Sequence, residues 1–105
     1  EGTDPDPGRW TNRIHRDDAA AAVVHLLTRA EAPDPVYLGN DDEPALLGDV
    51  AREVARLIGE DPPPAADVAQ VAPHGKRISN ARLRASGWTP AYPTYREGYA
   101  ALLRR

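Results

Sequence analysis

Apolar residues recur at helical spacing in two parts of the chain. In residues 19–30 they follow the i, i+3, i+4, i+7 pattern of one helix face, and Asp17 or Asp18 is expected to cap the start of this helix. Residues 47–58 show the same pattern, and Gly59 follows where a left-handed C-cap belongs. The buried faces predicted for these two helices comprise Ala19, Ala22, Val23, Leu26, Leu27 and Ala30 in the first, and Leu47, Val50, Ala51, Val54, Leu57 and Ile58 in the second.

Two short segments have the character of strands. Residues 11–15 form an extended piece around Ile14, and residues 36–38, bounded by prolines and by Gly39, predict a buried strand. A helix between two strands is typical of the crossover of a parallel sheet. Two short strands alone do not make a stable parallel sheet, because both faces and both edges of such a sheet must be covered. We therefore expect the rest of the sheet to lie in sequence not present here. Residues 60–75 predict an extended connection with, at most, a brief strand at Val68 and Val71.

The last third of the chain predicts two more helices. Ser79 is a suitable N-cap for a short helix over residues 80–86, which Gly87 would close. Thr94 and Glu97 have the spacing of a capping box and predict a final helix through residue 103. Gly98 lies inside that helix at a cost of about 1 kcal/mol relative to Ala, so we expect close packing there. The fold class expected is α/β and helix-rich, with two or three short strands and about four helices.

Length and composition indicate a single domain and exclude cysteine chemistry. The chain has 105 residues, which is the size of one domain, and it contains no Cys, which excludes disulfides, thiolate metal sites and a Cys nucleophile. No apolar run approaches the ~20 residues of a membrane span, so we expect no membrane partner and a cytoplasmic location. The chain has no Met and begins with Glu1, from which we expect a piece of a longer protein.

The net charge of −3 conceals an asymmetry. Residues 1–75 carry six basic and fifteen acidic side chains, whereas residues 76–105 carry seven basic and one acidic. A basic segment can attract phosphates or nucleic acid, but it is more often a solvated face. The overall acidity and the lack of a helix-turn-helix pattern disfavour nucleic acid as the partner.

Local motifs for catalysis are few. The chain has no Gly-rich nucleotide loop and no metalloprotease or hydrolase motif. His15 with Asp17 and Asp18 lacks the spacing of a metal site, and we interpret residues 41–43 as a solvated acidic turn. Four aromatic residues near the C-terminus are interpreted as a hydrophobic cluster in preference to a base-stacking surface: Trp88, Tyr92, Tyr95 and Tyr99.

Three segments together resemble the C-terminal part of the extended short-chain dehydrogenase/reductases, the NAD-dependent epimerase/dehydratase family. They are NRIHRDDA at residues 12–19, VYLGNDDEP at residues 36–44, and KRISN at residues 76–80 followed by GWTP at residues 87–90 and the terminal helix. Their order and spacing run through nearly all of the chain. The resemblance is greatest to an atypical branch of sugar-nucleotide epimerases and NAD(P)-binding proteins.

The resemblance implies that residues 1–105 are the substrate-binding C-terminal portion of an NAD(P)-dependent oxidoreductase, inactive alone. The Rossmann half that binds NAD or NADP and carries the Tyr-x-x-x-Lys pair would be absent from this chain, and that half would be its partner; a homodimer is left open. The substrate would be a sugar, a nucleotide sugar or another alcohol or carbonyl compound. Family members that act on nucleotide sugars usually carry Arg at the position of Thr11. The resemblance places six residues at or near the substrate: Asn12, Arg13, His15, Lys76, Arg77 and Asn80.

Two alternatives to an enzyme portion remain open. One is a non-catalytic NAD(P)-binding sensor or scaffold of the same family. The other is a small nucleic-acid-binding module that uses the basic residues 76–105.

Overall fold

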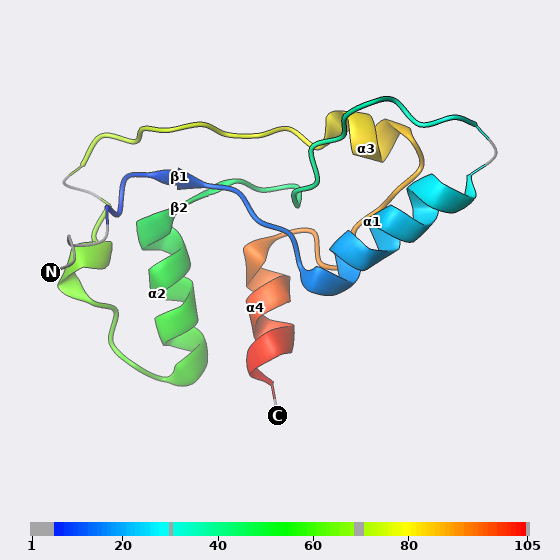
Figure 1. Ribbon diagram of the computed structural model, residues 1–105. Helices are drawn as coiled ribbons and strands as arrows, with labels where there is room; N and C mark the ends of the chain where they lie inside the picture. Colours follow the sequence, from blue (N-terminus) through cyan, green and yellow to red (C-terminus); the bar gives the residue numbers. More distant parts are fainter. Residues whose placement is uncertain (1–5, 30, 69–70, 105) are drawn as a thin grey trace, which may run out of the picture.

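The computed structural model describes residues 6–29, 31–68 and 71–104. Within them the chain is a small mixed α/β protein with four α-helices and one two-stranded sheet. The elements are β1 (Trp10–Thr11), α1 (Arg16–Thr28), β2 (Ala45–Leu46), α2 (Leu47–Ile58), the 3₁₀ helix η1 (Pro64–Ala66), α3 (Ala81–Ala85) and α4 (Tyr95–Leu103). Figure 1 shows α1 and α3 at one end, α2 at the other, and α4 between them.

The sheet differs from the predicted one. β1 pairs with β2 in antiparallel register, Trp10 opposite Leu46 and Thr11 opposite Ala45. Residues 36–38 form no strand, and Val36 and Leu38 are 60% and 49% exposed. The parallel crossover was therefore wrong for this chain, because a strand needs a hydrogen-bonding neighbour and no backbone bond joins residues 36–38 to another segment in the described part of the chain.

Two of the helix ends agree with the local signals. α2 has the predicted bounds, and Gly59 adopts a left-handed φ of 77° at its C-cap. The capping box of Thr94 and Glu97 is present at α4. The short α3 is one residue shorter at each end than expected, and the Ser79 hydroxyl accepts a hydrogen bond from the N–H of Ala81.

Other local predictions were wrong. α1 is capped by His15, whose Nδ1 accepts a hydrogen bond from the N–H of Asp17 at 3.0 Å, and not by either aspartate. Residues 60–75 contain η1, and Val68 and Val71 belong to no strand. Ala30, predicted as the last residue of the buried face of α1, lies outside the described residues.

The core has two parts. Ala22 of α1, Leu83 of α3 and Trp88 are buried together at one end, and Ala45, Val50 of α2 and Tyr95 of α4 at the other. Several predicted core residues are instead exposed: Val23 at 57%, Leu27 at 79% and Ile58 at 54%. The apolar stripe of α1 is thus wider than the surface that covers it.

Candidate functional site

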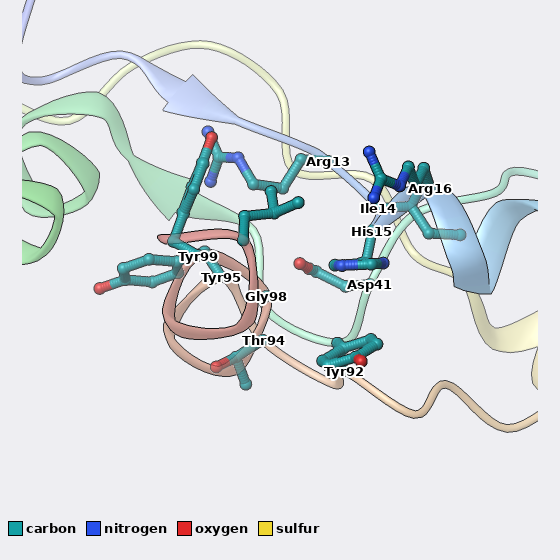
Figure 2. A pocket seen from close by; sticks show the side chains of 11 residues that line it. Arg13, Ile14, His15, Arg16, Asp41, Tyr92, Thr94, Tyr95, Gly98 and Tyr99 are labelled. Carbon is teal, nitrogen blue, oxygen red and sulfur yellow. The ribbon is translucent and has the colours of Figure 1, made fainter. Parts of the chain in front are cut away.

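A pocket of about 280 Å³ opens where the turn before α1 meets the N-terminal half of α4. Its wall consists of residues 13–16, Asp41 and six residues between 92 and 102. Figure 2 shows Arg13, His15 and Asp41 facing the tyrosines of the C-terminal segment across this pocket. Three segments that are distant in sequence therefore meet in one site.

His15 is held from both sides. Its Nδ1 caps α1, and its side chain is 4% exposed. Its ring stacks on Tyr92, with centroids 4.0 Å apart and planes at 22°. Because Nδ1 accepts a hydrogen bond, the neutral ring carries its proton on Nε2. Nε2 has no protein partner in the described part of the chain and keeps some exposure to solvent, and His15 is one of the residues that line the pocket.

Asp18 fixes the opposite wall of the pocket. Its side chain is buried, and its two carboxylate oxygens accept hydrogen bonds from the N–H groups of Ala91 and Tyr92 at 2.8 and 2.9 Å. Its backbone carbonyl also accepts from the indole N–H of Trp88. Asp18 thereby ties the first turn of α1 to the loop that carries the Tyr92 ring, which rests on His15.

Asp41 is a buried carboxylate in the same pocket, 3% exposed. Its backbone N–H donates to the carbonyl of Arg13 at 2.6 Å, and its Oδ1 accepts from the N–H of Glu43 at 3.0 Å. Burial raises the pKa of Asp41 to about 6, although that backbone hydrogen bond and the charge of Arg13 favour the ionised form. Oδ2 has no protein partner within the described residues and keeps some exposure to solvent, and Asp41 is one of the residues that line the pocket.

Arg13 is largely committed to the protein. One guanidinium nitrogen donates to the hydroxyl of Thr11, and the guanidinium lies 6.0 Å from the centre of the Tyr95 ring. Its Nη1 is buried without a partner. The positive charge of Arg13, a half-buried residue, therefore favours the ionised form of the neighbouring Asp41.

The structure brings two of the six predicted site residues to the pocket, Arg13 and His15. Asn12 instead spans to residues 76–78: its amide donates to the carbonyl of Lys76, and its Oδ1 accepts from the N–H of Ile78. The Asn80 amide donates to the carbonyl of Asn40 and to Asp42. Asn12 and Asn80 use their amides to join chain segments, which is a structural role.

Lys76 and Arg77 also lie away from the pocket. Both side chains are exposed, and the Arg77 guanidinium lies over the indole of Trp10, 4.9 Å from the ring centroid. The pocket around His15 is not lined by either residue. The predicted substrate residues therefore divide between two places on the molecule.

Sequence reasoning missed Asp41 and assigned the tyrosines only a packing role. Tyr95 and Tyr99 do pack in the core, as predicted, but they also line the pocket with Tyr92. Asp41 was interpreted as part of a solvated turn, yet it is buried. No local signal distinguishes it from the exposed Asp42, because the burial depends on α4 and on the turn before α1.

Much of the positive charge near the C-terminus is paired. Arg82 lies 3.9 Å from Asp34, Arg84 forms an ion pair with Asp42, and Arg96 lies 2.5 Å from Glu43. These pairs leave less free positive charge for a polyanion than the sequence count implies.

The described residues contain no group of three or more His, Cys, Asp or Glu side chains placed to hold a metal ion. None of their helices is long and apolar enough to cross a membrane.

Comparison with known proteins identifies a structural neighbour of unknown function. No protein-family model matches the chain, and no curated protein matches it. A solved structure described as that of a functionally unknown conserved protein from Silicibacter pomeroyi DSS is similar, with a TM-score of 0.74 and 36% sequence identity. The match covers 93% of this chain but 39% of that one, so this chain spans less than half of its neighbour's length.

Proposed function

We propose that this chain is the substrate-binding C-terminal portion of an NAD(P)-dependent epimerase/dehydratase-like oxidoreductase of the extended short-chain dehydrogenase/reductase family. Its substrate is a sugar, alcohol or carbonyl compound, and the chain does not catalyse alone. The three matched sequence segments imply the family. The observation that carries the proposal is the exposure of five large apolar side chains on α1 and on residues 36–38.

These side chains lie on one face of α1 and in residues 36–38. Val23, Val24 and Leu27 of α1 are 57%, 59% and 79% exposed, and Val36 and Leu38 are exposed at 60% and 49%. Five large apolar side chains in so short a stretch are typical of an interface, since isolated exposed apolar residues are common but clusters are not. Residues 36–38 form no strand and have no backbone hydrogen bond to another segment in the described part of the chain, so a sheet in the rest of the protein is the cover that we propose for them.

The structural neighbour is consistent in size with this proposal. That protein extends well beyond the part that this chain matches. It supplies no activity, because its own function is unknown.

The residues of this chain do not themselves fit a dinucleotide. The glycines with positive φ in the described part, Gly59, Gly75 and Gly87, do not lie at a strand-to-helix turn, where a phosphate-binding loop requires them. No Tyr is followed by Lys four positions later. The cofactor therefore belongs to the remainder of the proposed enzyme, and the described residues contribute the wall against which a substrate rests.

The test is the size and sequence of the native polypeptide. An antibody against this chain captures it from source cells, and mass spectrometry reads the captured protein. We expect a polypeptide longer than 105 residues, with a Gly-rich loop and a Tyr-x-x-x-Lys pair upstream. A longer polypeptide without that pair would favour the sensor, and a stable native product of 11.4 kDa that begins at Glu1 would contradict the proposal.

A second measurement uses the isolated chain. Fluorescence titration with NADH and NADPH is expected to show no binding in the micromolar range, and no turnover. Micromolar affinity would contradict the proposed division of labour between the two halves.

A further inference from the structure

Two nearly buried side chains of the pocket, His15 and Asp41, each have a polar atom without a partner among the residues that the structure describes. His15 keeps Nδ1 on the N–H of Asp17 and leaves Nε2–H as a free donor. Asp41 keeps Oδ1 on the N–H of Glu43 and leaves Oδ2 as a free acceptor. His15 and Asp41 line the same cavity, so the site is suited to a ligand group that pairs with both the donor and the acceptor. A hydroxyl does so, because it accepts from one atom and donates to the other.

Little of the chain's positive charge is available to a phosphate here. The guanidinium of Arg13 is bound to Thr11, and its Nη1 is sealed within the wall. Arg77 lies on Trp10, outside the pocket. Arg16 reaches the rim but is exposed and lies 3.8 Å from the carboxylate of Asp17. The Asp41 carboxylate is thus the group that an anionic ligand would meet, and like charges repel strongly where water is scarce.

The remaining wall is aromatic and apolar. Tyr92, Tyr95 and Tyr99 line the pocket with Ile14 and Leu102. Such walls pack against the C–H faces of a ring, and the tyrosine hydroxyls add polar edges. At about 280 Å³ the cavity suits one ring and not a nucleotide with its sugar.

We propose that this pocket binds an uncharged, polyhydroxylated ring compound of monosaccharide size, held by a hydroxyl between His15 and Asp41, and that it rejects phosphorylated and nucleotide-linked forms. That this ligand is the substrate rests on the proposed function; the binding itself does not.

The experiment is an NMR titration of the isotope-labelled chain with matched probes. D-Glucose, D-xylose and myo-inositol are the neutral probes, and glucose 6-phosphate and UDP-glucose are the charged ones. At least one neutral probe is expected to shift the resonances of His15 and Tyr92 in the millimolar range, while both charged probes leave them in place. Equal or larger shifts with a charged probe, or no shift with any neutral probe, would overturn the proposal.

Two variants and a control locate the binding. Asp41→Asn keeps an oxygen for the N–H of Glu43, and His15→Asn keeps an oxygen for capping α1, so both retain the local backbone contacts. Each is expected to weaken the neutral probe about tenfold. Arg77→Gln, outside the pocket, is expected to leave the affinity unchanged. Circular dichroism of each variant checks the fold. If both pocket variants fold and bind the neutral probe with unchanged affinity, the proposed binding between His15 and Asp41 is contradicted.

The two proposals fail separately. If the native protein has no reductase half but the chain binds a neutral probe, the pocket assignment is supported and its role in a reductase is contradicted. If the native protein is a reductase but its isolated C-terminal chain binds the charged probes, the proposed function is supported and the proposed substrate class is contradicted.

Discussion

Asp41 is a buried carboxylate that destabilises the fold in its ionised form. Its pKa is raised to about 6, chiefly by burial. The folded chain therefore binds more protons than the unfolded chain between about pH 4 and pH 6, and the free energy of unfolding falls as pH rises across that interval. A shift of this size corresponds to about 2–3 kcal/mol at neutral pH.

Asp41→Asn removes this cost. We expect the variant to raise the free energy of unfolding by about 2 kcal/mol at pH 7.5 and to match the unsubstituted chain at pH 4. Urea denaturation at both pH values measures the difference, and Asp61→Asn, at an exposed position, serves as the control. A gain that is the same at both pH values would show that the carboxylate does not titrate in this way.

Asp18 illustrates the opposite case, a buried carboxylate that stabilises the fold. Its two oxygens accept from Ala91 and Tyr92, and removing it leaves two N–H groups without their partner. We expect Asp18→Ala to lower the free energy of unfolding by about 3 kcal/mol. Asp18→Asn should also destabilise, because its NH₂ group would face one of those N–H donors. Chemical denaturation tests both, with the exposed Asp17→Asn as the matched control, for which a change of about 0.5 kcal/mol or less is expected.

Among the elements, two glycines inside helices differ in the space around them. A Cβ on Gly48 of α2 would lie 2.5 Å from the carbonyl oxygen of Ala66 and from Cγ1 of Val68. A Cβ on Gly98 of α4 would have its nearest neighbour, Cδ2 of His15, at 3.8 Å. The close packing expected at Gly98 is therefore found at Gly48 instead.

Substitution of each glycine by Ala should change stability in opposite directions. Gly48→Ala is expected to destabilise by about 1–3 kcal/mol, because η1 and the residues after it must move. Gly98→Ala is expected to stabilise by about 0.5–1 kcal/mol, because Ala has the higher helix propensity and meets only ordinary contacts. Thermal denaturation of the pair compares them directly, and a loss of stability in Gly98→Ala would reveal packing that the geometry does not show.

The bounds of α2 and the start of α4 were the most predictable parts of the fold, whereas the start of α1 was not predicted correctly. The bounds of α2 and the capping box of α4 depend on residues within a few positions of each other, and both were confirmed. Strands were the least predictable. The segment 36–38 has strand composition, but a strand forms only where a second chain segment supplies hydrogen bonds.

On the scale of the whole molecule, the exposed apolar face of α1 is a surface that the folding of this chain by itself does not explain. Folding of the isolated chain does not require Leu27, which is 79% exposed, whereas the proposed contact with the other half of the enzyme would bury it. The contribution of this residue to stability should therefore depend on how much of the protein is present.

Leu27→Asp tests this dependence. In the isolated chain we expect a change of about 0.5 kcal/mol or less in the free energy of unfolding. In the native polypeptide we expect lower thermal stability and lower abundance in cells, because a charge would be buried in the interface. Ala81→Asp, an apolar-to-acid change at an exposed position of α3, is the matched control. Equal behaviour of the two variants in the native polypeptide would argue against this face as the contact.

Local sequence by itself determined the mixed helix-rich class, the extent of α2, and the caps at Gly59 and Thr94, because these depend on hydrogen bonds and side chains within one or two helical turns. Only the tertiary structure decided which strands pair and which acidic residues are buried. The Asp18 carboxylate meets the N–H of Ala91 across 73 positions of sequence, and the Asp41 N–H meets the carbonyl of Arg13 from another segment. The pocket exists where these long-range contacts converge, and such convergence is a property of packing that no local pattern encodes.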